Sequence, residues 1–274
     1  MAARPTSHGC GLTIHWFRND LRLHDNPALC HTLRSTTSHN NSSSSSSSSS
    51  GGDGRAVVLP VFVFDTTRAY GSSIPPRHPH DPSSRKCGPR RARFVLEAVA
   101  DLRRNLKERG SGLAVGVGRP EEILARIASS FLETIATTAG GATEDGVVVS
   151  VICQEEPCSE ERTANDAVRA ALDAACAWCA DVRPSASARF DAVPGSTLYD
   201  PADLPFDRDE DGNECVPDAF APFRREVEAH CRIGAPLDAP SFGDASLSFL
   251  LRDVGAEWNV DNGSSSSSSS SSSS

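Results

Sequence analysis

Four short apolar runs stand out along the first 153 residues, and each is too continuous to alternate between a buried and an exposed face. Continuous runs of this kind are typical of strands that are covered on both faces, as in a parallel sheet. Pro60 lies inside the second run and indicates an edge position, a bulge or a late strand start, because proline has no N–H to donate. The predicted strands are Thr13–Phe17, Ala56–Phe64, Gly112–Val117 and Gly146–Cys153.

Between these runs, apolar residues recur every three or four positions, which is typical of one face of a helix. One such pattern ends at Gly110, and another follows Pro120 with Glu121 and Glu122 in its first turn, where acids suit the positive helix end. The periodic residues are Phe94, Val95, Ala98, Leu102 and Leu106, then Ile123, Leu124, Ile127, Phe131 and Ile135, then Ala164, Val168, Leu172 and Ala175. The alternation predicts an α/β fold, a doubly wound open parallel sheet of about five strands.

The pattern is interrupted or weakened in three places. Residues 36–55 contain a serine run from Ser42, and residues 71–90 are rich in Pro, His and Ser, so both are predicted to be insertions. Residues 190–206 are predicted to be extended segments and turns. A last helix is expected over 218–231, with Phe220, Phe223 and Val227 facing inward.

These patterns together predict one domain over residues 13–240. Residues 264–274 are a serine tail that is expected to be disordered because it can bury nothing.

The charge balance argues against a protein that binds nucleic acid by itself, because 27 basic residues face 36 acidic ones. Two local basic clusters, Arg85–Arg93 and Arg103–Arg109, are interpreted as a solvated helix start and a solvated helix face. No apolar run approaches the roughly 18 residues of a membrane span, and the amino terminus lacks a secretory signal. The expectation is an intracellular protein, with cytoplasm, nucleus and organelle left open.

The nine cysteines do not indicate a metal or redox site, because their spacing is not that of a zinc site. Cys176 and Cys179 form a C-A-W-C motif near the end of a helical pattern, whereas redox pairs open a helix. We therefore predict buried, reduced core cysteines and no metal site. The G-V-G at residues 116–118 is not a dinucleotide fingerprint, because Glu121 stands where a further glycine is needed and would repel a phosphate.

The charged residues after the first and fourth runs are the strongest candidates for a site, since ligands gather at the carboxyl ends of parallel strands. Arg18, Asp20 and Arg22 are expected to form an ion-pair network, alone or as the wall of a ligand pocket. Asp25 and Asn26 can cap the helix that starts near Pro27. The acids after the fourth run either stabilise a helix start or offer a carboxylate to a ligand's N–H groups; they are Glu155, Glu156, Glu160 and Glu161.

One motif decides between these interpretations. The stretch W-F-R-N-D-L-R-L-H-D-N-P-A-L, from Trp16 to Leu29, resembles the first strand and loop of the photolyase/cryptochrome family. The segments G-S-T-L-Y-D-P-A-D-L-P-F, from Gly195, and V-P-D-A-F-A-P-F-R-R-E-V-E, from Val216, are similar to the DASH-type cryptochrome branch. The resemblance runs from about Ile14 to Gly255, apart from the insertions. The segment S-L-S-F-L-L-R-D-V-G, from Ser246, is similar to the segment just before the family's linker, which implies that residues 241–260 are the start of an interdomain linker.

The resemblance implies the family's amino-terminal α/β domain, which carries an antenna pigment such as 5,10-methenyltetrahydrofolate or a deazaflavin and passes excitation to FAD. In the family, FAD lies in a separate helical domain, whose site is expected to be absent here, so the chain alone is not expected to repair DNA. The family holds a folate antenna with a carboxylate after the fourth strand, and Pro157 and Cys158 depart from its pattern there. The implied pigment-binding candidates are Glu156, Glu160 and Glu161, with Phe17, Arg18 and Asp20 as the pocket wall.

Two other functions stay open at this point. The chain could be a non-catalytic interaction module that binds the helical FAD-binding domain, in cis or in trans, through a surface left uncovered. It could also be a nucleotide-binding α/β domain of the adenine-hydrolase type, although the glycine-rich loops of such domains are missing.

Overall fold

Strands and helices alternate along the chain in the computed structural model, which describes residues 11–42, 56–70, 87–138, 147–179, 186–207 and 215–240. The predictions for the serine run from 43 to 50, most of the 71–90 insertion, the linker from 241 and the serine tail fall outside these residues. The elements are β1 (Gly11–Phe17), α1 (Pro27–Ser42), β2 (Ala56–Asp65), α2 (Pro89–Glu108), β3 (Ala114–Gly118), α3 (Pro120–Thr138), β4 (Val148–Gln154), α4 (Ser159–Cys179), β5 (Ser187–Val193), the 3₁₀ turn η1 (Pro201–Asp203) and α5 (Phe220–His230).

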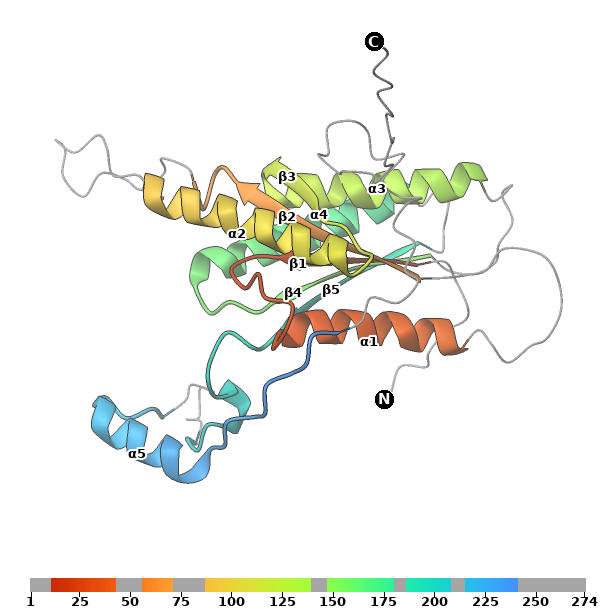
Figure 1. The fold of residues 1–274 in the computed structure, drawn as a ribbon. Helices are drawn as coiled ribbons and strands as arrows, with labels where there is room; N and C mark the ends of the chain where they lie inside the picture. Colours follow the sequence, from red (N-terminus) through yellow and green to blue (C-terminus); the bar gives the residue numbers. More distant parts are fainter. Residues whose placement is uncertain are drawn as a thin grey trace, which may run out of the picture.

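The described strands form one five-stranded sheet in the order β3-β2-β1-β4-β5 (Figure 1). Every pairing is parallel, and β1 lies between β2 and β4, so the winding reverses between β1 and β4. The predicted doubly wound α/β fold is confirmed. Ligands of such sheets bind in the crevice beyond the carboxyl ends of the strands that flank the reversal, here β1 and β4.

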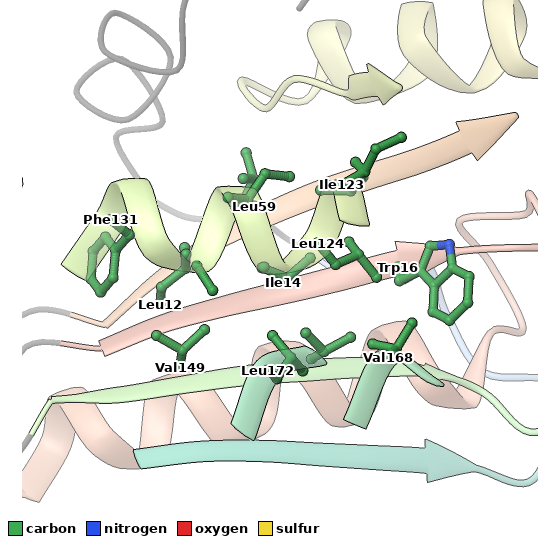
Figure 2. Close-up of a cluster of buried hydrophobic side chains, with 14 of the residues drawn as sticks. Leu12, Ile14, Trp16, Leu59, Ile123, Leu124, Phe131, Val149, Val168 and Leu172 are labelled. Atoms are coloured by element: carbon green, nitrogen blue, oxygen red, sulfur yellow. The ribbon is translucent and has the colours of Figure 1, made fainter. Parts of the chain in front are cut away.

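Strand β1 is buried along all seven of its residues. Its even-numbered side chains, Leu12, Ile14 and Trp16, join a core cluster with residues of α3 and α4, as Figure 2 shows. Phe17 points to the opposite face and packs with residues of α1 and α2. Because helices cover both faces of the sheet, its central strand is apolar throughout, which explains the continuous run in the sequence.

Pro60 belongs to β2, an interior strand, and is in register with His15 of β1. On the other side of β2, pairing with β3 begins only at Val61. Pro60 therefore lies in the part of β2 that is not yet paired with β3. Because proline has no N–H, this position avoids the loss of a hydrogen bond to β3. Of the three alternatives for Pro60, the edge position holds at this residue but not for the strand, and a late strand start is wrong because β2 begins at Ala56.

Several helical predictions need correction. Helix α1 extends to Ser42, into the segment predicted to be an insertion. Phe94 in α2 and Phe220 in α5 are 68% and 73% exposed, although their spacing predicted inward-facing side chains. Only the second half of α2 contributes buried residues, and in α5 only Val227 is buried. Each helix therefore carries an apolar stripe longer than the surface that covers it.

The fifth strand is the element that the apolar pattern did not isolate. Residues 190–206 were predicted to be extended segments and turns, whereas β5 already begins at Ser187. It is an edge strand paired only with β4, and its residues are exposed or partly buried. An edge strand with so little burial needs no continuous apolar run, so the sequence carried only a weak signal for it.

The segment after α5 returns to the sheet and is fastened to the loop before α1 (Figure 1). The Asp25 N–H donates to the Leu237 carbonyl at 2.7 Å, and the Leu237 N–H donates to Asp25 Oδ1 at 3.2 Å. Asp25 has a φ of 51°, in the left-handed region that aspartate tolerates better than most residues. Asn26 caps α1 as predicted, since its Oδ1 accepts from the Leu29 N–H at 2.9 Å, whereas Asp25 binds the returning segment instead.

His15 is a buried titratable group in the centre of the sheet, 1% exposed. Its Nδ1 lies 2.8 Å from Thr32 Oγ1, and the Thr32 hydroxyl donates to the Ala28 carbonyl at 2.8 Å. Because that hydroxyl has a single proton, His15 must carry its own proton on Nδ1 and donate to Thr32. Burial lowers the pKa of His15 to about 3, against a smaller opposing effect of the Asp20 charge, so the ring stays neutral.

We expect His15 to make the fold acid-sensitive. The unfolded chain binds a proton at this residue near pH 6.5 and the folded chain only near pH 3, so the free energy of unfolding should fall by up to about 1.4 kcal/mol per pH unit between these values. Urea unfolding at a series of pH values should show a shallower slope for H15L than for the wild type. The matched control is H24Q at an exposed histidine; a wild-type slope in H15L would contradict the assignment.

Candidate functional site

A cleft of about 170 Å³ opens at the carboxyl ends of β1 and β2, between the start of α2 on one face and the start of α4 on the other. It lies beside the reversal of winding, where a doubly wound sheet is expected to bind ligands. Its walls combine aromatic rings, three arginines and two glutamates; these residues are Trp16, Phe17, Tyr70, Phe94, Arg18, Arg68, Arg91, Glu160 and Glu161. Such a mixture suits a flat ligand with both polar and apolar surface.

Arg18 is held rigidly at the mouth of the cleft. Its guanidinium carbon lies 4.5 Å from the centroid of the Trp16 ring, and its Nη1 donates to Asn165 Oδ1 of α4 at 2.7 Å. The ring stacking and the hydrogen bond fix the planar guanidinium in one orientation. Arg18 thus connects β1 to α4 and does not join the predicted ion-pair network with Asp20 and Arg22.

Glu160 and Glu161 lie in the first turn of α4, immediately beyond β4, and both line the cleft. Their position at the helix start is favourable for negative charge, as in the alternative in which these acids stabilise a helix start. Glu161 Oε2 is nevertheless buried and has no hydrogen-bond partner within the described part of the chain. A buried carboxylate oxygen without a donor is costly, and a ligand N–H would relieve that cost.

Two of the six predicted site residues do not line the cleft. Asp20 accepts from Arg22 Nε at 3.0 Å and from Arg22 Nη2 at 2.9 Å, and Arg22 also reaches Asp25 at 3.2 Å. Glu156 accepts from Asn19 Nδ2 at 3.1 Å, which joins the loop after β4 to the loop after β1. These contacts brace the two loops, while the predicted Phe17, Arg18, Glu160 and Glu161 gather at the cleft.

A second charged group closes the β2 and β3 end of the site. Arg68 donates from Nη1 and Nη2 to the two oxygens of Glu121 at 2.9 and 3.0 Å, and Arg119 donates to Glu121 Oε1 at 2.7 Å. Burial alone would raise the pKa of Glu121, but the hydrogen bonds from Arg68 and Arg119 and the Arg68 charge outweigh it and lower the pKa to about 2. Glu121 stands where a dinucleotide-binding fingerprint would need a glycine. Its carboxylate is thus paired with two arginines.

Sequence reasoning missed Arg68, Tyr70, Arg91 and Phe94 as parts of the cleft. Arg91 was interpreted as part of a solvated helix start, and Phe94 as a core residue. The only sequence signal was the position of Arg68 and Tyr70 just after a strand end. Burial raises the pKa of Tyr70, so its phenol stays protonated beside the cleft.

Two of the cysteines, Cys153 and Cys176, are buried in the core. Cys153 at the end of β4 is fully buried, and that burial raises the pKa of its thiol to about 11 even though Arg18 favours the thiolate. Cys176 is buried and is not part of a disulfide, and the side chain of Cys179 lies outside the described set. Within the described ranges no three His, Cys, Asp or Glu residues gather as a metal site, and no helix is long and apolar enough to cross a bilayer.

The family model for DNA photolyase matches residues 13–241. The chain belongs to the DNA photolyase family. The resemblance drawn from the Trp16–Leu29 motif is therefore confirmed, and so is the DASH branch, because the curated relatives named below are DASH-type cryptochromes.

Two curated relatives show the extent of the similarity. The chain is 33% identical over 232 residues to Cryptochrome DASH, chloroplastic/mitochondrial, of Arabidopsis thaliana, which covers 85% of this chain and 31% of the relative. It is 33% identical over 226 residues to Cryptochrome DASH of Gloeobacter violaceus, covering 82% and 34%. The chain thus spans about a third of the length of these relatives.

The crystal structure of a cryptochrome from Synechocystis sp. PCC6803 has the same fold over most of the chain. The TM-score is 0.55 at 24% sequence identity, and the match covers 86% of this chain and 37% of that one. This photolyase-family domain therefore has the doubly wound architecture of a solved cryptochrome.

We expect Glu121 to stabilise the carboxyl edge of the sheet at neutral pH. Replacing it by glutamine should lower the free energy of unfolding by about 1.5–3 kcal/mol at pH 7, because charged hydrogen bonds from two arginines are lost. The contribution is present above pH 4.5 and disappears as the pH falls through about 2, so the difference from wild type should shrink in acid. Urea unfolding at pH 7 and pH 3 measures both.

The matched control for this prediction is E97Q. Glu97 pairs with Arg93 on the exposed face of α2, and its side chain is 63% exposed. Such a surface pair should contribute less than about 1 kcal/mol. Equal losses of stability in E121Q and E97Q would contradict the role given to Glu121.

Proposed function

We propose that the cleft at the carboxyl edge binds a light-harvesting antenna pigment, and that this photolyase-family domain serves a DASH-type cryptochrome or photolyase as its antenna domain. The observation that supports this most directly is the buried Oε2 of Glu161, which lacks a partner among the described residues and belongs to a side chain that lines an aromatic cleft. A pigment with a ring N–H supplies the donor that this oxygen lacks.

The residues of the cleft fit the chemistry of a 5,10-methenyltetrahydrofolate or a deazaflavin. Both pigments have a flat heteroaromatic ring with N–H donors, and the folate also has an anionic tail. Trp16, Phe17 and Phe94 offer ring surface, Glu161 offers an acceptor, and Arg91 offers a cation for the tail. The pigment, when bound, supplies absorption of near-ultraviolet or blue light and transfer of excitation to a flavin.

The remaining charges of the cleft hold the site in shape. Arg18 is fixed by Trp16 and Asn165, and Arg68 is fixed by Glu121 and Asp65. Because these cations are bound to other groups, neither of them neutralises Glu161, whose Oε2 has no partner among the described residues. The role proposed for these residues is light capture, and catalysis on DNA is not assigned to them.

The pigment proposal predicts a specific loss in E161Q. Purified wild-type chain mixed with methenyltetrahydrofolate should co-elute with a near-ultraviolet band, and E161Q should raise the dissociation constant at least about tenfold, because a charge-assisted hydrogen bond is lost. E156Q is the matched control, since Glu156 lies in the same loop region but binds Asn19 and does not line the cleft.

The outcomes of this experiment separate the candidates. Loss of binding in E156Q with retention in E161Q would move the pigment carboxylate to Glu156. Absence of co-elution in the wild type at high micromolar pigment would remove the folate, and the same titration with a deazaflavin would then test the second pigment.

A second proposed role is docking of the helical FAD-binding domain, in cis or in trans, on the α5 region. In Figure 1, α5 stands apart from the layers that cover the sheet. Its Phe220 is 73% exposed, and Ile233, which follows the end of the helix, is 57% exposed. The Phe220 ring also lies 6.5 Å from the Phe223 ring, which stacks on Phe206 at 5.4 Å between centroids. Apolar side chains that gather in this way at the surface are typical of an interaction surface.

Gel filtration tests the docking role directly. The chain mixed with the helical part of the Arabidopsis relative should elute as a complex, and F220S should weaken that complex several-fold because an exposed aromatic anchor is lost. W178S, which changes a side chain 66% exposed at the end of α4, should leave it intact. Equal weakening by both substitutions would argue against a specific α5 surface.

A further inference from the structure

A second hollow lies between α2 and the sheet edge formed by β3, and we call it the α2–β3 groove. It shares no lining residue with the pigment cleft. Its volume is about 410 Å³. α2 forms one wall, and the end of β2 and the approach to the edge strand β3 form the other. The lining residues that matter are Arg103, Arg104, Lys107, Phe64, Leu96 and Val115.

The charge of the groove is opposite to that of the whole protein. The chain has 36 acidic and 27 basic residues, yet three cations and no Asp or Glu line this groove. Arg103 and Lys107 are four residues apart, so they lie on the same face of α2. A concentration of cations without matching acids creates a local positive potential that attracts an anion.

Arg103 is the cation that most clearly requires a ligand. Its Nη2 is buried and has no hydrogen-bond acceptor among the described residues. Its neighbour Arg104 differs, since Arg104 Nη2 forms an ion pair with Asp101 one turn earlier on α2. A buried guanidinium N–H without an acceptor costs free energy, and an anionic oxygen in the groove would remove that cost.

The rest of the groove is apolar, which limits the kind of anion it suits. Phe64 and Val115 are partly buried beneath it, and Leu96 on α2 is 57% exposed at its rim. The volume lies within the range of small-molecule sites. An inorganic ion would use the cations and leave this apolar surface in water, whereas an organic molecule with a charged group would cover both.

We propose that the α2–β3 groove binds a small organic phosphate. The phosphate lies against Arg103 and Lys107, and the apolar body of the molecule covers Leu96, Phe64 and Val115. A phosphate is favoured over a carboxylate because Arg103 and Lys107, on the same face of α2, match the charge of a dianion, and guanidinium groups bind phosphate oxygens in pairs.

The proposal has a consequence for stability that a structural role of Arg103 does not share. Since Arg103 Nη2 has no internal partner to lose, R103M should keep or raise the melting temperature of the free protein, by up to a few degrees. The same substitution should weaken stabilisation by the ligand at least tenfold. A structural arginine would instead lower the melting temperature when it is replaced.

The experiment is thermal unfolding of the full chain with pyrophosphate or ADP as the probe, at constant ionic strength set with potassium chloride. Both probes should raise the melting temperature of the wild type, and ADP should act at a lower concentration if its body covers the apolar wall. R103M should weaken the effect at least tenfold and K107Q several-fold. R93Q, on the exposed face of α2 and paired with Glu97, should behave as the wild type.

Each result either supports or overturns the proposal. If pyrophosphate and ADP stabilise the protein at the same concentration, the phosphate site is supported, and the apolar wall makes no contact with the body of the ligand. An equal response in R103M places the ligand elsewhere and overturns the proposal. No response of the wild type to millimolar probe overturns it as well, as does a fall in the melting temperature of free R103M. None of these results bears on pigment binding, which E161Q tests separately.

Discussion

The central strand β1 is buried on both faces and flanked on both edges, and this burial constrains the rest of the molecule. No residue from Gly11 to Phe17 can present a charged group to a ligand without breaking the core. Polar chemistry is therefore displaced to the residues that follow Phe17. Because all the described strands are parallel, the loops after β1, β2 and β4 come together at the same edge.

The charges gathered at that edge are of two kinds. Some neutralise one another, as Arg22 does with Asp20 and Asp25, or Arg68 and Arg119 with Glu121. These groups hold loops in place and depress the pKa of Glu121. Glu161 differs because one of its buried oxygens is unmatched within the described residues, although partnered charges surround it. Such an unmatched group weakens a fold unless something outside the chain binds it.

A second buried group that is unmatched within the described part of the chain, Arg103 Nη2, belongs to a residue of α2 that lines the other hollow. This helix is anchored by Val99, Leu102 and Leu106, and it separates the pigment cleft from the α2–β3 groove. Its first turns overhang the cleft with Arg91 and Phe94, and its later turns supply Arg103 and Lys107 to the groove. One amphipathic helix thus contributes to two separate hollows, because its buried stripe is narrow compared with its length.

The sequence by itself determined the elements with strong local signals. Continuous apolar runs predicted the strands, helical spacing predicted the helices, and the alternation of the two predicted the doubly wound sheet and the edge where its charges meet. The edge strand β5, with little burial, gave only a weak signal. The motif from Trp16 to Leu29 predicted the family.

Only the tertiary structure decided which charges pair and which apolar side chains stay exposed. Arg18 binds Asn165, 147 residues away, and Asp25 binds Leu237, 212 residues away. Periodicity cannot show such partners, because it reports which face of an element is apolar and not what lies opposite that face. For the same reason Phe94 and Phe220 looked like core residues in the sequence, yet they are 68% and 73% exposed.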